Sequence, residues 1–304
     1  MAKLRRNREY ILSVTPPFPR NMLLEVSNIC NNDCIFCGHH NMRRKQENCN
    51  KPQMLDIIQQ AYDAGTREIG FYLQGEPFLN PDLEEYISFC KNAGFEYIYM
   101  TTNGVGATAE KVEKLNKLGL SSIKFSINAA TRDTYRIVHR RDHFDSVMKN
   151  FMDIVHKKRE GSITIPIFVS YVVVPENEGE IELFKEKIGV YCDDVDIDGA
   201  RNMAGNMPEL PCKNEAPCIQ LFNRLHITKE GYLNACCGDI DNMLAAADLR
   251  QVPLKEAWNC PEMMELRRQH LAGEIGNTIC YDCIYGRYDK EIAPINKTLY
   301  HTVL

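Results

Sequence analysis

The sequence predicts an α/β protein, with a partial (β/α)6 barrel on a parallel sheet followed by a small, cysteine-rich α+β domain. Two observations carry this prediction. From residue 22 to about residue 200, short apolar runs alternate with charged, amphipathic segments, which is the pattern of repeated strand-helix units. After Arg201 the alternation stops, and short segments with many cysteines follow.

The barrel elements follow one another in regular order. The expected strands are residues 22–26, 68–73, 96–101, 122–127, 163–174 and 195–198. The expected helices are residues 52–64, 81–93, 109–118, 131–138, 145–158 and 179–191. Pro52 and Pro81 suit helix starts, and Gly94 and Gly119 suit helix ends. Six strands are too few for a full eightfold barrel.

The boundaries follow from these changes in pattern. We expect an N-terminal extension at 1–21, the barrel at 22–201, a proline-containing linker at 202–217, and the cysteine-rich domain at 218–304. Within the last domain, residues 221–228 and 232–235 read as strands of a hairpin. Residues 253–271 read as a helix interrupted near Pro261.

Bulk properties exclude several classes of protein. A formal net charge of −5 over 304 residues argues against a nucleic-acid-binding surface. No run of about 18 apolar residues predicts a membrane span, and the N-terminus lacks a secretory signal. We therefore expect a cytoplasmic protein without nucleic-acid or membrane partners. In that reducing compartment, 13 cysteines favour metal or cluster binding over disulfides.

The first cysteine set comes directly after the first predicted strand. Cys30, Cys34 and Cys37 lie on one short loop, where three thiolates can hold three irons of a cubane cluster and leave the fourth iron open. Three cysteines with His39 or His40 also suit zinc, so a zinc-stabilised binding protein is an alternative at this point.

Further motifs lie directly after the predicted strands. They are Gln74-Gly75-Glu76-Pro77 after the second strand, Thr101-Thr102-Asn103-Gly104 after the third, and Ser126-Ile127-Asn128 at the end of the fourth. With the cysteine triplet, and with Phe36 just before its last cysteine, they resemble the radical S-adenosylmethionine (radical SAM) superfamily. Gln74 departs from the glycine that is usual there, and Glu76 stays in place.

The resemblance implies a cofactor and its site. Cys30, Cys34 and Cys37 would hold a 4Fe-4S cluster whose open iron chelates S-adenosylmethionine. The implied chemistry is reductive cleavage to methionine and a 5′-deoxyadenosyl radical, which abstracts hydrogen from a substrate. The implied partners are a small-molecule substrate and a reducing electron donor such as flavodoxin or ferredoxin. The implied cofactor contacts are Phe36, Gly75, Glu76, Pro77, Asn103, Ser126 and Asn128.

A second cysteine set lies in the C-terminal domain. Cys218, Cys236, Cys280 and Cys283 are a complete four-ligand set, whose spacing alone fits zinc as well as an iron-sulfur cluster. The arrangement resembles the twitch domain, the shortened SPASM extension. Because no cysteine follows Cys283, the resemblance implies one auxiliary 4Fe-4S cluster rather than two.

The resemblance also suggests a reaction. It is nearest to twitch enzymes that dehydrogenate the aminocyclitol 2-deoxy-scyllo-inosamine, which implies oxidation of a small polyhydroxylated, aminocyclitol- or sugar-like substrate. Arg201, 17 residues before Cys218, takes the place of a substrate-contacting arginine. The alternative is a loop arginine that pairs with a surface acid.

Two residues that follow the implied ligand Cys236 leave open whether the reaction is an oxidation or an epimerisation. Cys237 and Asp239 are candidate catalytic residues, and a Cys237 thiol that returned hydrogen to the substrate radical would give epimerisation. The alternative for Cys237 is packing. Modification of a ribosomal peptide is a further alternative, although only 29 residues precede Cys30, too few for a separate leader-binding domain.

Overall fold

The computed structural model describes residues 11–212 and 214–301, so part of the expected N-terminal extension, residues 1–10, lies outside the described residues.

The strands are β1 (Asn21–Leu24), β2 (Glu68–Phe71), β3 (Tyr97–Thr102), β4 (Ser122–Ser126), β5 (Ile167–Val173), β6 (Asp194–Gly199), β7 (Arg224–Ile227), β8 (Tyr232–Asn234) and β9 (Ala245–Asp248). The α-helices are α2 (Lys51–Asp63), α3 (Leu83–Ala93), α4 (Ala109–Leu118), α5 (Arg132–His139), α6 (Phe144–Arg159), α7 (Ile181–Lys187), α8 (Gln220–Asn223), α9 (Leu254–Ala257), α10 (Pro261–Ala272), α11 (Ile279–Tyr285) and α12 (Lys297–His301). Short 3-10 helices are η1 (Gly38–Asn41), η2 (Pro77–Leu79), η3 (Glu178–Glu180) and η4 (Gly189–Tyr191).

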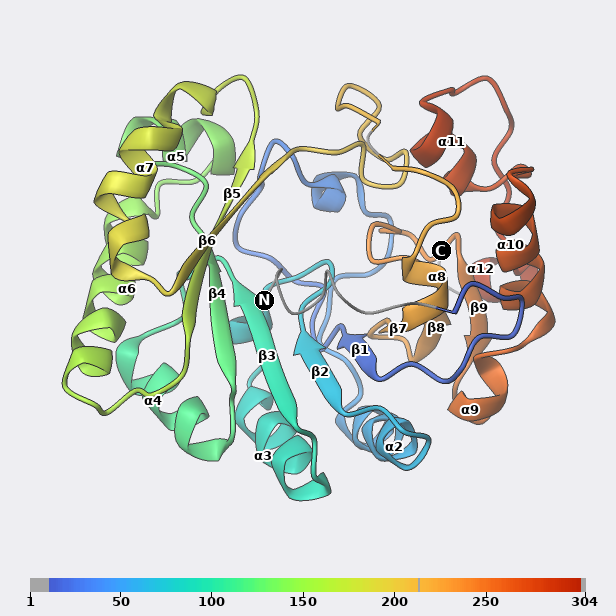
Figure 1. The fold of residues 1–304 in the computed structure, drawn as a ribbon, viewed down its shortest axis with the longest axis horizontal. Coiled ribbons are helices and arrows are strands. Elements are labelled where there is room, and N and C mark those ends of the chain that lie inside the picture. The colour runs from blue at the N-terminus through green and yellow to red at the C-terminus, as the bar shows by residue number, and fades with distance from the viewer. Residues whose placement is uncertain (1–10, 213, 302–304) are drawn as a thin grey trace.

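All the strands belong to one open sheet (Figure 1). Their order is β6-β5-β4-β3-β2-β1-β7-β8-β9. Neighbouring strands from β6 to β7 are parallel, whereas β8 is antiparallel to both β7 and β9. The predicted α/β fold with a partial barrel of six strand-helix units is confirmed. The cysteine-rich segment adds three strands to the same sheet, because β7 pairs with β1.

Local sequence signals explain the helix boundaries. Asn50 caps α2, its side chain accepting from the backbone N–H of Gln53, with proline in the first turn. Gly94 ends α3 and Gly119 ends α4, both in left-handed backbone geometry that glycine adopts without strain. Helix α4 has the predicted bounds. Helix α3 begins at Leu83, two residues after the predicted start at Pro81. The side-chain oxygen of Asn80 accepts from the Asp82 N–H in a turn that precedes the helix.

The two faces of the sheet differ. Met22 and Leu24 point from β1 into the apolar core beneath the helices, where burial of such a side chain stabilises the fold by about 2 kcal/mol. The opposite face is crowded at its centre. A Cβ on Gly70 would lie 2.6 Å from the Tyr99 ring and 2.8 Å from Leu23, so only glycine fits between them. We call the face that carries Leu23, Gly70 and Tyr99 the inner face.

Two predicted barrel elements are wrong in part. The helix expected at 179–191 is split into η3, α7 and η4, because Ile188 leaves helical geometry (φ −122°, ψ −46°) just before Gly189. The strand expected from residue 163 begins at Ile167. Pro166 precedes it and has no N–H to donate to a neighbouring strand.

One predicted element of the C-terminal domain is also wrong. Residues 221–223 were expected to begin a strand, and instead they end the short helix α8. The N–H of Leu221 donates to the carbonyl of Cys218, and the N–H of Phe222 donates to that of Ile219. Both apolar side chains are buried in this helical turn, so burial alone does not distinguish strand from helix here.

The expected linker at 202–217 packs against α11. The buried Asn202 amide donates to the carbonyl of Asp282 at 3.0 Å, and a Cβ on Gly205 would lie 2.7 Å from the Cβ of Asp282. This contact holds the segment over the helix that carries Cys280 and Cys283. Of the helices that the structure describes, none has the length and apolar character that crossing a bilayer requires.

Candidate active site

The first cysteine loop, residues 30–37, is held by the end of α5. The N–H of Asp33 donates to the carbonyl of His139 at 3.1 Å, and the N–H of Ile35 donates to that of Val138 at 2.9 Å. These bonds join segments more than 100 residues apart in the sequence. The loop is thus shaped by tertiary contacts as well as by its own turn.

The three cysteines of this loop are half-buried. Burial raises the pKa of Cys30 to about 11 and also raises the pKa of Cys34 and Cys37. Charge on Cys37 or Cys30 raises the pKa of Cys34 further, because these thiols lie close to one another. Buried thiolates need a metal to take up their charge. This donor set therefore fits a cluster held by three cysteines.

His139 contacts the thiol of Cys34. Its Nδ1 lies 3.0 Å from Cys34 Sγ, its Nε2 lies 2.8 Å from the carbonyl oxygen of Ile127, and its ring meets Phe36 edge to face at 6.0 Å. Burial lowers the pKa of His139 to about 4, so the ring is neutral at pH 7. His39, the alternative zinc ligand, instead bonds through Nε2 to the carbonyl oxygen of Asn28.

The loop after β2 packs directly against the cysteine loop. A Cβ on Gly75 would lie 2.3 Å from the carbonyl oxygen of Ser27, so the close approach requires glycine. The N–H of Glu76 donates to the carbonyl of Ile29 at 2.8 Å. Pro77 then begins η2.

Glu76 joins two of the predicted motifs. Its carboxylate accepts from the Thr102 hydroxyl at 2.7 Å, from the Asn103 N–H at 2.7 Å and from the Phe78 N–H at 3.1 Å. Burial raises the pKa of Glu76 to about 7. The Asn103 amide in turn donates to the Asn31 side chain in the cysteine loop. Hydrogen bonds of side chains therefore link the three loops after β1, β2 and β3.

The predicted residues after β4 lie against β5. Ser126 Oγ is 3.2 Å from Ser170 Oγ. Asn128 has a left-handed backbone (φ 57°), and its side-chain oxygen accepts from the Val172 N–H at 2.8 Å. Its Nδ2 is buried without a hydrogen-bond partner among the described residues. A buried amide donor of this kind is available to a bound ligand.

The second thiol set is also gathered in one place. Cys218 precedes α8, Cys236 follows β8, and Cys280 and Cys283 lie on α11. The hydrogen bond from Cys237 and burial raise the pKa of Cys236, and charge on Cys218 and Cys283 raises it further. Burial, then charge on Cys283 and Cys218, raises the pKa of Cys280. Cys280 is buried and the other three cysteines are half-buried, and this donor set fits one metal cluster.

The structure places the three candidate catalytic residues differently. Arg201 is partly exposed and pairs with Asp198 at 2.7 Å, yet it lies near enough to Cys218 to counteract the rise in the pKa of that thiol. Asp239 is buried, and its carboxylate accepts from Asn234 and from the N–H groups of residues 241, 243 and 244. These bonds give it a structural role in the turn that follows Cys236.

Cys237 lies among residues that the sequence did not single out. Its thiol hydrogen-bonds with Cys236, and this bond, followed by the nearby His226 and Arg224, holds the pKa of Cys237 well below its usual range. The Gln74 amide donates to the Cys237 carbonyl oxygen at 2.6 Å. The one available signal was alternation in β7, which puts Arg224 and His226 on the same face.

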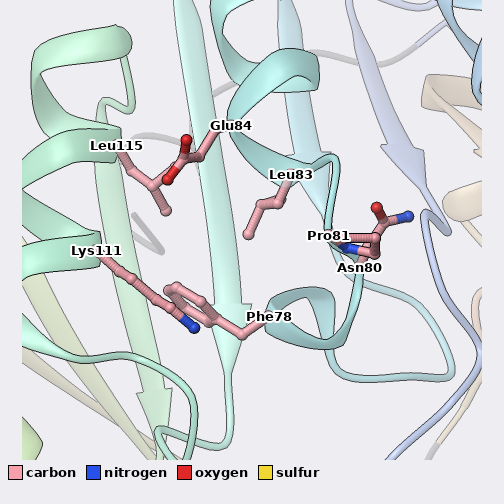
Figure 2. Close-up of a pocket in the computed structure, with 7 residues that line it drawn as sticks. All are labelled: Phe78, Asn80, Pro81, Leu83, Glu84, Lys111 and Leu115. Atoms are coloured by element: carbon pink, nitrogen blue, oxygen red, sulfur yellow. The ribbon is translucent and has the colours of Figure 1, made fainter.

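A separate hollow lies away from these residues. Figure 2 shows it between η2, the start of α3 and α4, with the Phe78 ring and the Lys111 side chain at its wall. Its other lining residues are Asn80, Pro81, Leu83, Glu84 and Leu115. None of these is a predicted site residue.

An open parallel α/β sheet that carries one buried set of three thiols and another of four is typical of enzymes that use iron-sulfur clusters beside a bound cofactor. The family model of the Radical SAM superfamily matches residues 24–188, and the chain belongs to this superfamily. An iron-sulfur cluster-binding domain of SPASM type matches residues 218–284. The chain is thus a radical SAM enzyme that uses S-adenosylmethionine, a 4Fe-4S cluster and an auxiliary iron-sulfur cluster.

Curated relatives cover part of the chain. A probable GTP 3',8-cyclase of Saccharolobus solfataricus is 27% identical over 166 residues, which are 55% of this chain and 52% of the relative. A PqqA peptide cyclase of Streptomyces rochei is 30% identical over 113 residues, 37% of this chain and 30% of the relative. The chain spans about half the length of the GTP 3',8-cyclase relative and less than a third of the length of the peptide cyclase relative.

Solved structures share the fold over most of the chain. BtrN in complex with AdoMet and 2-DOIA aligns with a TM-score of 0.55 at 14% identity, over 83% of this chain and 86% of that one. Streptococcus suis SuiB bound to the precursor peptide SuiA aligns with a TM-score of 0.67 at 13% identity, over 86% of this chain and 68% of that one.

Proposed function

We propose that this enzyme dehydrogenates a small polyhydroxylated, aminocyclitol- or sugar-like substrate. The observation that carries the proposal is the connection between the two thiol sets, because Gln74 next to the cofactor motif bonds to Cys237 next to the second set. A substrate between them would be within reach of both. The shared fold with BtrN, solved with AdoMet and 2-DOIA, is consistent with this substrate class.

The cofactor contacts that we propose surround the first thiol set. They are Phe36, Gly75, Glu76, Pro77, Asn103, Ser126 and Asn128. Of these, the Asn128 amide has a buried, unpartnered donor, and Glu76 holds the loops after β2 and β3 in a fixed relation. When bound, S-adenosylmethionine and the first cluster supply the radical that abstracts a hydrogen atom, and the auxiliary cluster supplies an acceptor for one electron.

The chain itself binds the substrate and excludes water. Conversion of an H–C–O–H unit to a ketone removes one hydrogen atom, one proton and one electron, so a competing hydrogen source at the radical stage would divert the reaction. Arg201, whose charge acts on Cys218, is the proposed substrate contact. The electron donor that starts the reaction is proposed to be a flavodoxin or ferredoxin.

The test is anaerobic reconstitution followed by product analysis. Incubation with S-adenosylmethionine, reductant and a panel of aminocyclitols and sugars should give a ketone with one 5′-deoxyadenosine per ketone. Arg201→Gln should raise KM roughly tenfold, whereas Arg159→Gln, an exposed arginine on α6, should not. A colourless protein that holds only zinc, or deoxyadenosine without any oxidised product, would contradict the proposal.

Epimerisation of the same kind of substrate is a second candidate. Its supporting observation is the buried Cys237 thiol, which adjoins the second set without belonging to the four proposed ligands. In its protonated form, a thiol there would give a hydrogen atom to the substrate carbon and become a thiyl radical, which one electron from the external reductant and one proton would return to the thiol. The same assay in deuterated water distinguishes the two reactions, because epimerisation places deuterium at an inverted carbon and dehydrogenation does not.

Peptide modification is the third candidate. It is supported by the fold shared with SuiB bound to its precursor peptide and by the partial match to a PqqA peptide cyclase. Ketone formation from a free sugar or aminocyclitol would exclude it as the main activity.

A further inference from the structure

Strand β7 places two cationic residue types on the inner face of the sheet. In the parallel register between β7 and β1, Arg224 lies level with Asn21 and His226 lies level with Leu23. Residues level with one another in a sheet project to the same face, and Leu23 meets Gly70 on the inner face. Arg224 and His226 therefore project into the interior of the partial barrel.

These two side chains have no nitrogen or oxygen hydrogen-bond partner in the described part of the chain. His226 is fully buried, and the group that its ring contacts there is the Cys237 thiol. The buried Nε of Arg224 is likewise unpartnered. Leaving a buried donor without an acceptor destabilises the fold. The arrangement therefore calls for an acceptor other than the described residues.

Two fully buried arginines show how this chain satisfies a structural cation, whereas Arg224 is half-buried with its Nε inside. Arg44, fully buried, donates two bonds of 2.8 Å to the carboxylate of Glu25. Arg267, also fully buried, donates through Nε to the carbonyl of Leu221 at 2.9 Å. Arg224 has neither kind of partner at its Nε, which sets it apart from the arginines that hold the fold together.

A hydrogen-bond acceptor lies beside the same pair. Strand β7 pairs with β8, with His226 level with Asn234, and Cys237 follows β8 three residues later. The Cys237 thiol has a side-chain hydrogen bond with His226, and the charge of Arg224 acts on it. Gln74 reaches this point through its Nε2, which bonds to the Cys237 carbonyl, and its Oε1 is buried without a partner in the described chain. The donors of Arg224 and His226 and the acceptor Oε1 of Gln74 thus lie around Cys237.

We infer that Arg224, His226 and Gln74 form a subsite that binds a negatively charged group of the substrate, a carboxylate or a phosphate. Arg224 and His226 donate to the anionic oxygens, and Gln74 Oε1 accepts from a neighbouring hydroxyl. The inference rests on the proposed function and narrows it, since it makes the polyhydroxylated substrate an acid or a phosphate ester.

Calorimetric titration of the reconstituted holoenzyme tests the subsite without turnover, because no reductant is added. The probes are inorganic phosphate, gluconate as a carboxylate-bearing polyol, and sorbitol as its neutral counterpart. Phosphate or gluconate should bind at least roughly tenfold more tightly than sorbitol. Which anion binds more tightly distinguishes a phosphate ester from an acid.

Variants assign the binding to these residues. Arg224→Gln should weaken binding of the preferred anion by roughly tenfold or more, and Arg224→Lys should weaken it less because it keeps the charge. Arg159→Gln is the matched control, an exposed arginine that stacks on Tyr191, and it should bind like the wild type. Iron content and circular dichroism check that each variant is folded and carries both clusters.

The outcomes are separable from those of the proposed function. Equal affinity of the wild type and Arg224→Gln for both anions, equal affinity of the Lys and Gln variants, or no anion binding to the wild type would overturn the subsite. Anion binding without ketone formation would support the proposed subsite and contradict the proposed dehydrogenation. Ketone formation from a neutral polyol by an enzyme that binds no anion would support the dehydrogenation and contradict the subsite.

Discussion

The side-chain amide of Gln74 donates a 2.6 Å hydrogen bond to the backbone carbonyl of Cys237, 163 residues further along the chain. Gln74 stands two residues before Glu76, which links the loops after β2 and β3. Cys237 is next to Cys236, a proposed ligand of the auxiliary cluster. A single side chain therefore connects the cofactor motif with the second thiol set.

Gln74→Gly restores the residue that is usual in this motif and removes the connection. Loss of one hydrogen bond of about 1 kcal/mol should lower product formation by several-fold up to about tenfold. Cleavage of S-adenosylmethionine should persist, because Gly75 and Glu76 are unchanged. The ratio of 5′-deoxyadenosine to product is the measurement, with Gln59→Ala on the exposed face of α2 as the control. An unchanged ratio would show that the bond does not couple the two sets.

The two thiol sets should fail in different ways. Cys37→Ala should abolish 5′-deoxyadenosine formation, because it removes one of three ligands of the first cluster. Cys283→Ala should leave some cleavage but little product. In each variant the iron content should fall by roughly half. Cys192→Ser is the matched control, since the Cys192 thiol lies outside both sets and donates to the carbonyls of Gly189 and Asp194, to which a hydroxyl can also donate.

Local patterns carried much of the sequence-based prediction. The bounds of α4 follow from its capping Thr108 and the left-handed Gly119, both of which are visible in the sequence. The first cysteine set and each loop motif are short and contiguous, so their spacing alone brings their members together, whereas the second cysteine set draws its members from three separate segments. The partial barrel likewise follows from the repeated strand-helix pattern.

What the sequence could not supply depends on tertiary register. His139 meets Cys34 although 105 residues separate them, and no local pattern encodes that contact. Arg224 and His226 face inward only because β7 pairs with β1, whereas the expected hairpin said nothing of that neighbour. Asp239 follows the cysteines closely in sequence, yet its carboxylate turns back to bind its own loop. Its position in the chain therefore did not reveal its role.

The Glu25 carboxylate should be essential for folding. It accepts two bonds of 2.8 Å from Arg44 and one of 2.9 Å from the Lys229 N–H, in full burial. Glu25→Gln leaves Glu230, 2.8 Å from Arg44, as the remaining carboxylate partner of the buried guanidinium, and the loss of the Glu25 charge should lower the free energy of unfolding by about 3 kcal/mol. Glu85→Gln, in an exposed pair with Lys51, should change it by less than about 1 kcal/mol. Urea denaturation of both variants is the measurement, and equal effects would contradict the prediction.

The neutral ring of His139 should make the cluster-free protein sensitive to acid. Burial lowers the pKa of His139 from 6.5 to about 4. Between these values the unfolded chain binds the proton and the folded chain does not. The contribution of the neutral His139 ring to the free energy of unfolding is therefore fully present above about pH 6.5 and is lost as the pH falls toward about 4.

From about pH 7.5 to about pH 5, this one group should remove about 2 kcal/mol from the free energy of unfolding. His139→Gln cannot titrate, so its unfolding free energy should fall by that much less over the same interval, all other groups being equal. Urea denaturation at the two pH values gives both differences. The idea fails if wild type and variant lose the same amount, because the acid sensitivity would then belong to groups other than the ring beside Cys34.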